Sequence, residues 1–121
     1  MKNKSEINLA LAFKALSNTN RLKVFEIIRN GYRSIPQCVD SCRPNGIPDN
    51  AVCVCEILER LNITAPTLSH HLKELRNAGL VDVYHRGQWS YYSIKEDSLE
   101  TILHYFKTGS VRNAGTRKSR R

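Results

Sequence analysis

Apolar side chains recur every three or four residues in five segments of this 121-residue chain, which is the spacing of helices that bury one face. The predicted helices run from about Ser5 to Leu16, from Asn18 or Thr19 to Gly31, from Cys53 to Leu61, from Thr64 to Gly79 and from Asp97 to Lys107. The first segment is apolar nearly all the way round, so it needs burial on two sides. One of those sides is expected to be a partner subunit.

The fourth predicted helix has the clearest end signals. Thr64 is a favourable N-cap, Pro66 fits a first turn where its missing N–H is not needed, and Gly79 can adopt the left-handed conformation that ends a helix. The residues expected to face the core are Leu68, Leu72 and Leu75 in this helix, Leu22, Phe25 and Ile28 in the second, and Ile57, Leu58 and Leu61 in the third.

A short β-hairpin is predicted after the fourth helix. Residues 80–85 alternate loosely as a strand, residues 86–88 form the turn, and residues 89–94 return as a second strand rich in aromatic side chains. Trp89 and Tyr91 are expected to pack rather than to stack on bases. Because residues 62–64 connect the third and fourth helices with the length that a helix-turn-helix uses, the expected fold class is mainly α with a small β-hairpin, a winged helix-turn-helix.

The fourth helix carries short polar side chains in its N-terminal half, which is the part of a recognition helix that enters the major groove of DNA. Hydroxyl and imidazole groups can reach base edges there, and lysine can meet a phosphate. An arginine at the tip of the hairpin can enter a minor groove or contact phosphate. The candidate DNA contacts are Thr64, Thr67, Ser69, His70, Lys73 and Arg86, whereas His71 is expected to pack in the core.

The formal net charge is +8, but residues 112–121 carry five basic and no acidic side chains, which leaves +3 for the rest. A basic balance favours a polyanion such as nucleic acid. No apolar run is long enough to span a bilayer and the N-terminus has no signal-peptide core, so we expect a cytoplasmic protein with no membrane partner. The expected domain is residues 1–108, with an irregular cysteine-containing insertion at about 32–51, followed by a basic tail of residues 109–121 that is expected to be disordered.

Four cysteines lie in or just after the insertion. Residues 32–51 break the helical pattern with three prolines and one glycine, and they contain Cys38 and Cys42. Cys53 and Cys55 follow at the start of the third predicted helix. In a cytoplasmic protein such cysteines are reduced, metal-binding or redox-active more often than paired in structural disulfides.

The spacing of Cys53 and Cys55 puts them about 200° apart around a regular helix. They cannot jointly hold one ion from an intact helix, but they can if its first turn unwinds, and unwinding would strain the helix that supports the recognition helix. The spacing of Cys38 and Cys42 suits thiolate ligation, and a flexible loop can bring them over the other pair. Small buried hydrophobic side chains, a structural zinc site of all four cysteines and a reversible disulfide sensor are the other open interpretations.

The run VCVCEILERLNITAPTLSHHLKELRNAGLV, with FKALSNTNRLKVFEII before it and GQWSYYSI after it, resembles the ArsR/SmtB family of metal-responsive winged-helix repressors. The similarity spans about residues 7–106 apart from the insertion, and the Cys-Val-Cys placement is similar to that of arsenic and cadmium/lead sensors. The resemblance implies a homodimeric repressor whose inducer is bound by Cys53 and Cys55. Arsenic sensors of this kind carry a third thiolate one helical turn further on, where this chain has Leu58.

The resemblance therefore implies that Cys42 or Cys38 supplies the third ligand, and that use of both would give the four-sulfur site of the cadmium/lead branch. Soft thiolates exclude magnesium and calcium but do not choose among arsenic, cadmium, lead and zinc. Zinc sensors of the family carry a histidine and carboxylate set on the last helix, whereas His104 has no second histidine in its helix. The first and last helices form the dimer interface in the family, which here points to Leu9, Phe13, Leu99, Leu103 and Phe106.

The sequence thus predicts a transcriptional repressor that binds double-stranded operator DNA and is released by trivalent arsenic or antimony. It is not expected to be an enzyme, because the chain has no Gly-rich phosphate loop, serine elbow or carboxylate pair beside a base or nucleophile. No permanently bound cofactor is expected, and cadmium, lead and zinc are alternative inducers. The alternative functions are a four-sulfur cadmium/lead sensor of the same fold and a thiol-redox-responsive regulator.

Overall fold

The computed structural model describes residues 7–31 and 46–108. Its elements are α1 (Leu9–Leu16), α2 (Thr19–Asn30), β1 (Val52–Cys53), α4 (Val54–Arg60), α5 (Ala65–Asn77), β2 (Val81–Arg86), β3 (Trp89–Ile94) and α6 (Glu96–Thr108). The expected architecture, mainly α with a small β-hairpin, is confirmed. The predicted tail, Cys38, Cys42 and most of the insertion lie outside the described residues.

The helices begin where short polar side chains cap them. The side chain of Asn18 accepts a hydrogen bond from the backbone N–H of Arg21 (2.9 Å), and α2 ends at Gly31, whose φ is 75°. Thr64 caps α5 in the same way, and Gly79 follows that helix with a φ of 77°, so both end signals of α5 are confirmed. The predicted cap at Ser5 was wrong, because α1 begins at Leu9.

Asn8 is the residue that caps α1. Its backbone is extended, and its side-chain oxygen accepts a hydrogen bond from the N–H of Leu11 at 3.0 Å. Asparagine competes well with serine for this position because its short side chain reaches the free N–H groups of the first turn. A cap only three residues after the predicted one therefore shortens the helix by almost a turn.

The main core lies between the helices and the sheet. It contains Leu68, Leu72 and Leu75 of α5 and Ile57 of α4, as predicted, and Leu58 and Leu61 are half-buried against it. The main-core residues contributed by α2 are Val24, Phe25 and Ile28. Leu22 is 37% exposed, so its predicted inward position was wrong.

Arg21 explains the shift of the buried stripe on α2. Residues three, four and seven positions before Ile28 lie on the same face of the helix, and these are Phe25, Val24 and Arg21. Arg21 therefore occupies the place on the buried face that was predicted for Leu22. Its guanidinium Nη1 donates a hydrogen bond to the carbonyl of Ala15 at the end of α1 (3.2 Å). This bond satisfies only part of the guanidinium, because the buried Nε of Arg21 has no hydrogen-bond partner among the described residues.

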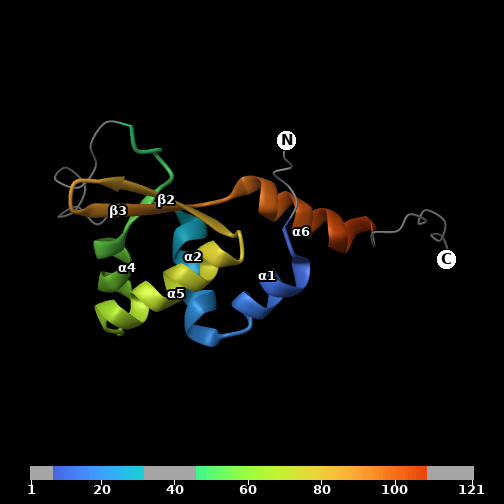
Figure 1. Ribbon diagram of the computed structural model, residues 1–121, viewed down its shortest axis with the longest axis horizontal. Helices are drawn as coiled ribbons and strands as arrows, with labels where there is room; N and C mark the ends of the chain where they lie inside the picture. Colours follow the sequence, from blue (N-terminus) through green and yellow to red (C-terminus); the bar gives the residue numbers. More distant parts are fainter. Residues whose placement is uncertain (1–6, 32–45, 109–121) are drawn as a thin grey trace.

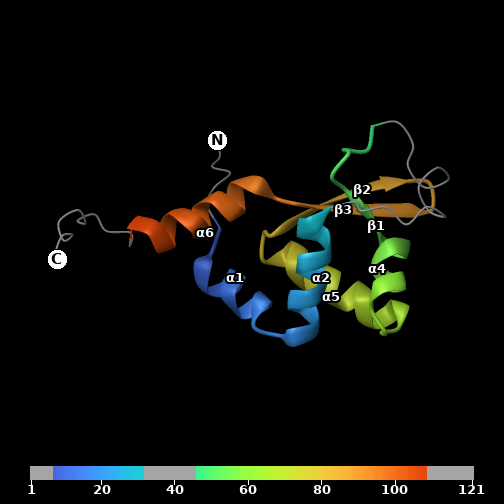
Figure 2. The same ribbon diagram turned by 180° about the vertical axis from the view of Figure 1, so that it is seen from behind.

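The sheet has three strands in the order β1-β3-β2, all antiparallel. The predicted hairpin is confirmed, although its turn is only Gly87-Gln88, because Arg86 still pairs with Trp89. The two-residue strand β1 was not predicted. It pairs Val52 with Tyr92 and Cys53 with Tyr91, and it leads directly into α4 (Figure 2).

The two faces of the sheet belong to different clusters. Alternate residues of a strand point to opposite faces, and here the inner face contributes Val52, Val81, Val83, Tyr92 and Ile94 to the main core. The outer face carries Cys53, Tyr84, Trp89 and Tyr91. These residues pack with Ile47, Ala51 and Cys55 into a second cluster, which we call the outer cluster.

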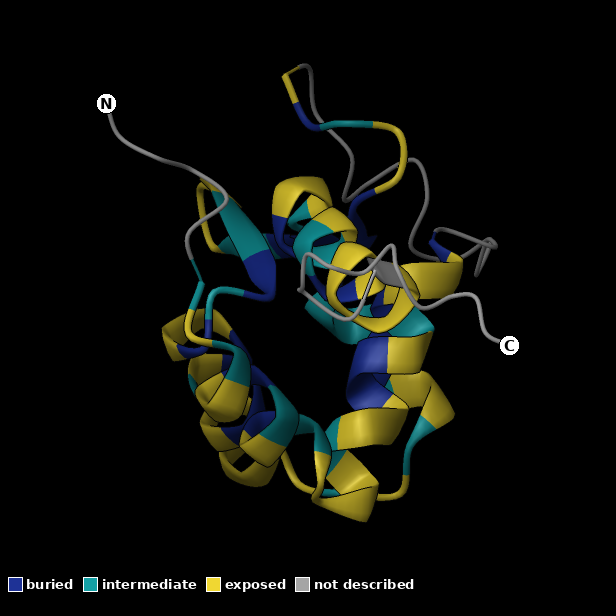
Figure 3. Cartoon of the chain, turned by 90° about the vertical axis from the view of Figure 1, so that its right-hand side faces the viewer, coloured by how far each residue is buried: buried dark blue, intermediate teal, exposed yellow. Residues whose placement is uncertain are grey.

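Helix α6 extends away from the sheet beside α1 (Figures 1 and 2). It packs through Ile102, which is 8% exposed, while Leu103 and Phe106 are 52% and 66% exposed. Figure 3 shows this helix largely exposed in front of the buried faces of the other elements. In the single chain, α6 therefore has an exposed apolar surface that includes Leu103 and Phe106.

Candidate thiol site and DNA-reading face

Helix α5 separates a polar surface from a buried apolar one. Leu68, Leu72 and Leu75 are at most 2% exposed. The predicted DNA contacts of this element, Thr64, Thr67, Ser69, His70 and Lys73, are all exposed. The structure thus brings these side chains to one surface without a covering element among the described residues.

Thr64 and Thr67 interact with each other at the start of α5. The Thr64 hydroxyl donates to the Thr67 hydroxyl at 2.9 Å, and it also accepts from the backbone N–H of Thr67 at 3.3 Å. A side chain held by its cap geometry presents a fixed hydroxyl rather than a mobile one. Thr64 therefore acts first as the cap that positions the helix.

His71 lies on the buried side of α5, as predicted. It is 7% exposed, and its Nδ1 has no hydrogen-bond partner among the described residues. Burial, the nearby Arg21 guanidinium and the neighbouring His70 lower the pKa of His71 below its ordinary value of 6.5. The imidazole is therefore held neutral between the recognition helix and α2.

Arg86 lies at the tip of the hairpin, the wing. Its Nη1 donates to the carbonyl of His85 at 3.0 Å, and a Cβ placed on Gly46 would lie only 2.6 Å from its Nη2. The guanidinium therefore rests against the end of the insertion while remaining exposed. Sequence reasoning identified Arg86 but not this neighbour, which is 40 positions away in the chain.

The sulfur atoms of Cys53 and Cys55 lie 2.9 Å apart. They are adjacent because Cys53 is the extended N-cap residue of α4, with φ −70° and ψ 143°, and only Cys55 lies in the helix. The prediction that the helix begins at Cys53 was therefore wrong, and the separation expected for two residues of a regular helix does not apply to this pair. The strand-to-helix junction already brings them together without unwinding the first turn.

The thiol pair fits a soft metal or metalloid. Tetrahedral thiolate ligation with bonds of about 2.3 Å holds two sulfurs about 3.8 Å apart, so the observed pair needs to open by less than about 1 Å. The described residues contain no group of three or more potential metal ligands. A metal site with three or more such ligands would therefore need at least one ligand beyond residues 7–31 and 46–108.

The structure also records Cys55 as disulfide-bonded, and Cys53 is not its partner. The separation of 2.9 Å between the two sulfurs agrees with this, because a disulfide bond measures about 2.05 Å. Cys53 is 3% exposed and Cys55 is half-buried. The two sulfurs therefore lie close together, but Cys55 becomes a thiol only when its disulfide is reduced.

Glu56 is a buried charge next to the thiol pair that sequence reasoning did not single out. It is 1% exposed, and its carboxylate forms an ion pair with Arg60 one turn along α4 (3.2 Å). Glutamate is rarely buried unless it is paired. Its position after two cysteines gives no sequence signal for burial, because only the fold encloses it.

The predicted dimer residues occur together along α1 and α6. The ring of Phe13 lies 5.5 Å from that of Phe106 and 6.1 Å from that of Tyr105. Leu9, Phe13 and Leu99 are half-buried, and Leu103 and Phe106 are exposed. Phe13 thus joins the two helices through its ring contacts. Leu9 and Leu99 pack against the main core, and Leu103 and Phe106 remain exposed in the single chain.

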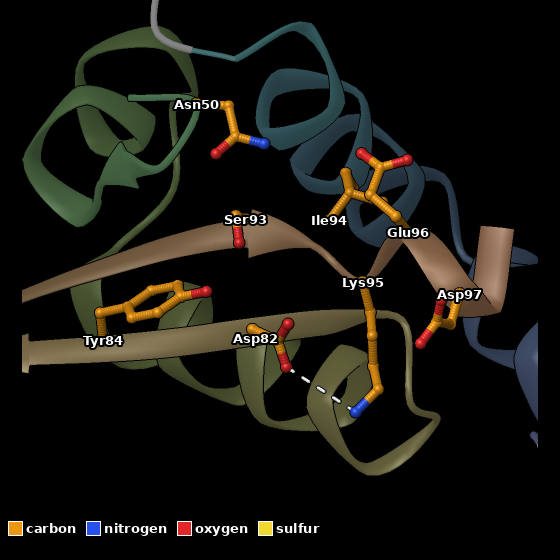
Figure 4. A pocket seen from close by; sticks show the side chains of 8 residues that line it. All are labelled: Asn50, Asp82, Tyr84, Ser93, Ile94, Lys95, Glu96 and Asp97. Atoms are coloured by element: carbon orange, nitrogen blue, oxygen red, sulfur yellow. Dashed lines mark ion pairs between the residues drawn. The ribbon is translucent and has the colours of Figure 1, made fainter. Parts of the chain in front are cut away.

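A pocket of about 420 Å³ opens on the outer face of the sheet (Figure 4). Tyr84 and Asp82 of β2 line one side, where Lys95 Nζ lies 3.8 Å from Asp82 Oδ1. The other lining residues are Asn50, Ser93, Ile94, Glu96 and Asp97. Because Tyr84 also belongs to the outer cluster, this pocket borders that cluster directly.

None of the described helices has the length and apolar composition needed to cross a membrane.

Comparison with known proteins places the chain among transcriptional regulators. Residues 49–83 match the family described as bacterial regulatory protein, arsR family. An uncharacterized HTH-type transcriptional regulator of Methanocaldococcus jannaschii is 31% identical over 91 residues, which cover 75% of this chain and 82% of that protein. The arsenical resistance operon repressor of Bacillus subtilis is 29% identical over 92 residues, 75% of this chain and 70% of the relative.

Two further matches extend the comparison. The cadmium resistance transcriptional regulatory protein CadC of Listeria innocua is 31% identical over 91 residues, 75% of this chain and 61% of the relative. An ArsR-like transcriptional regulator from Rhodococcus sp. RHA1 has the same fold, with a TM-score of 0.59 at 19% identity, covering 84% of this chain and 79% of that one. The family match, these relatives and the winged helix-turn-helix fold of the chain agree. We conclude that this chain belongs to the ArsR/SmtB family of transcriptional regulators.

Proposed function

We propose that the protein is a homodimeric repressor that binds operator DNA through α5 and the wing, and that trivalent arsenic or antimony releases it. The inducer is held by Cys53, Cys55 and a third thiol from the insertion, Cys42 or Cys38. The observation that carries this proposal is the 2.9 Å separation of the Cys53 and Cys55 sulfurs at the start of α4. Once the Cys55 disulfide is reduced, two neighbouring sulfurs offer a soft ion two ligands with little rearrangement.

The position of the thiol pair supports control of DNA binding. Cys55 lies in the first turn of α4, and the polar connection after α4 leads directly to the Thr64 cap of the recognition helix. An inducer that releases DNA must bind the DNA-free form more tightly than the bound form, by about 1–3 kcal/mol. Movement of the residues that surround the thiol pair would create this difference.

The surface of α5 supports operator binding. In a dimer the two recognition helices would enter successive major grooves about 34 Å apart on a palindromic site. Hydroxyl groups and His70 would read base edges, whereas Lys73 would contact phosphate. Leu103 and Phe106 are exposed on the apolar surface of α1 and α6. An exposed apolar surface of this kind supports the proposal that a second copy of the chain packs against it in a dimer.

Two alternatives have separate support. A four-sulfur site that uses both Cys38 and Cys42 would suit cadmium or lead, and one relative is named as a cadmium resistance regulator. A thiol-redox-responsive regulator is supported by the disulfide recorded at Cys55. In both cases the same thiol pair would receive the signal.

The test is an operator-release titration by fluorescence anisotropy at fixed salt, because protein–DNA affinity depends strongly on ionic strength. Reduced protein on its upstream DNA receives arsenite, antimonite, cadmium, lead or zinc separately. We expect release by arsenite and antimonite, and no release of the Cys53→Ser, Cys55→Ser double variant. The proposal fails if this double variant, still bound to DNA, is released as readily as the wild type.

Single Cys42→Ser and Cys38→Ser variants identify the third ligand. Loss of arsenite release in one of them alone assigns a three-sulfur site, whereas release by cadmium or lead that needs both thiols assigns the four-sulfur alternative. Release by peroxide in metal-free buffer would instead support the redox alternative. Each outcome separates one of the three functions from the others.

A further inference from the structure

We propose that the thiol pair is coupled to DNA through the wing, because Arg86 is the strand partner of Trp89 in the outer cluster that contains the thiols. This inference rests on the proposed function and specifies how its signal reaches DNA. The sequence alone suggested a different route, in which ligation strains α4 and thereby α5. The contacts of Cys53 and Cys55 favour the wing instead.

The first observation is that the thiols pack with the wing. Cys53 is buried in the outer cluster with Tyr91, and Cys55, Tyr84 and Trp89 pack against them. The aliphatic residues of α5 belong to the main core on the other side of the sheet. A change in the volume of the thiol site therefore acts first on wing side chains.

The second observation is that Cys53 is also joined to the wing through the backbone. Cys53 pairs with Tyr91 of β3, and Trp89, two residues earlier in β3, pairs with Arg86 at the end of β2. The side chains of cross-strand partners lie on the same face of a sheet. Cys53 and Tyr91 thus lie next to the Trp89 and Arg86 pair on the outer face.

The third observation concerns residues 46–51, which precede β1 directly. Ile47 and Ala51 are buried in the outer cluster, at 8% and 0% exposure. Gly46, at the start of this segment, has a φ of 94° and lies against the Arg86 guanidinium. The same short segment therefore contacts the thiol cluster at one end and the wing-tip arginine at the other.

These contacts give a mechanical account of release. In protein whose Cys55 disulfide has been cleaved by an added thiol reductant, capture of a soft ion requires the sulfurs of Cys53 and Cys55 to move apart. Cys53 cannot move without shifting its strand partner Tyr91 or the segment that leads into it. Either movement changes the surface on which Arg86 rests. The pocket beside Tyr84 leaves room on this face for side chains to rearrange. Arg86 is then withdrawn from the phosphate or minor groove that it contacts.

The test compares the factor by which arsenite weakens operator binding in two variants. Arg86→Ala removes the wing contact, whereas Lys73→Ala removes a contact of α5, and each is expected to weaken binding roughly tenfold without inducer. If the signal passes through the wing, Arg86→Ala already lacks the DNA contact that arsenite would remove. The factor by which arsenite weakens its operator binding, the arsenite factor, should therefore fall toward one. Lys73→Ala should keep the wild-type factor, because contacts that do not share a route add independently.

A glycine pair tests the same point with Arg86 intact. Gly46→Ala places a Cβ 2.6 Å from Arg86 Nη2, whereas Gly87→Ala has the same kind of backbone strain, at φ 62°, but meets no atom within 4 Å. We expect Gly46→Ala to reduce the arsenite factor and Gly87→Ala to keep it. Circular dichroism of both variants checks that each is folded.

The outcomes separate this inference from the proposed function. If arsenite does not release the wild type, the proposed function fails and the inference fails with it. If the wild type is released and Arg86→Ala is released by the same factor, the proposed function stands and the wing route alone is overturned. If the arsenite factor is reduced in Lys73→Ala and unchanged in Arg86→Ala, the signal reaches DNA through α5 and the wing route is overturned.

Discussion

The two faces of the three-stranded sheet are packed by different parts of the chain and suit different tasks. The inner face lies on α2, α4 and α5 and joins a main core of mostly aliphatic side chains. The outer face is covered by residues 46–51 and holds two thiols, two tyrosines and the chain's single tryptophan. Since alternate residues of β3 serve the two faces, one strand connects a stable core to a chemically reactive cluster.

The difference between the two faces suggests how a regulator can bind an inducer without losing its fold. Core packing is intolerant of volume changes because interiors are as dense as organic crystals. The outer cluster borders an open pocket and is smaller, so it can change its shape at lower cost. Sensing chemistry on the outer face therefore leaves the scaffold of the recognition helix intact.

The largest expected effect comes from the inner side. Leu75 is fully buried in the main core, so Leu75→Ala should lower the free energy of unfolding by about 2–5 kcal/mol through lost transfer energy and a residual cavity. Urea denaturation followed by circular dichroism measures this loss. A loss below that of an outer-cluster truncation would contradict the division of the sheet into a stabilising and a sensing face.

The matched change on the outer side is Ile47→Ala. Ile47 is 8% exposed in a small cluster, and its truncation should cost about 1–2 kcal/mol in the same denaturation experiment. The folded variant should also show weaker release by arsenite than the wild type. Unchanged stability together with unchanged release would show that residues 46–51 contribute to neither property.

A smaller effect is expected at the start of the recognition helix. Thr64→Ala removes the cap of α5 and should cost about 1 kcal/mol of stability. Operator affinity should fall because the first turn carries candidate DNA contacts. Thr64→Ser keeps the capping oxygen and serves as the control, and an equal loss in both variants would assign the effect to the methyl group instead.

The smallest effect is pH dependence at His71. Because its pKa is lowered in the fold, the unfolded chain binds the proton more readily, so stability is fully present above about pH 6.5 and falls as the pH drops below that value. Denaturation midpoints between pH 7.5 and 5 measure the slope, and His71→Gln should flatten it. A midpoint that rises on acidification would contradict the assigned sign.

Local signals in the sequence predicted the ends of the helices well. Asn18, Gly31, Thr64 and Gly79 act within one turn of their own position, so their roles can be read without knowledge of the fold. The exception, Ser5 in place of Asn8, arose because two good caps compete within a few residues. The buried stripe of α2 was misplaced for a tertiary reason, since Arg21 reaches the carbonyl of Ala15.

The candidate site was predictable in its residue types but not in its geometry. The sequence identified Cys53 and Cys55, yet a helical projection separated them. Strand β1 has only two residues and pairs with β3 almost 40 positions later, which no local periodicity can reveal. For the same reason neither the contact of Gly46 with Arg86 nor the burial of Glu56 was visible in the sequence.

Trp89 allows the central claim, that the thiol pair and the wing share one cluster, to be tested without DNA. It is the chain's single tryptophan and packs in the outer cluster with Cys53 and Cys55. The measurement is the Trp89 emission spectrum of reduced, DNA-free protein during an arsenite titration. We predict a saturable change in the wild type that is absent in the Cys53→Ser, Cys55→Ser variant. An unchanged spectrum while arsenite binds to the wild-type thiols, or the same change in the double variant, would contradict the claim.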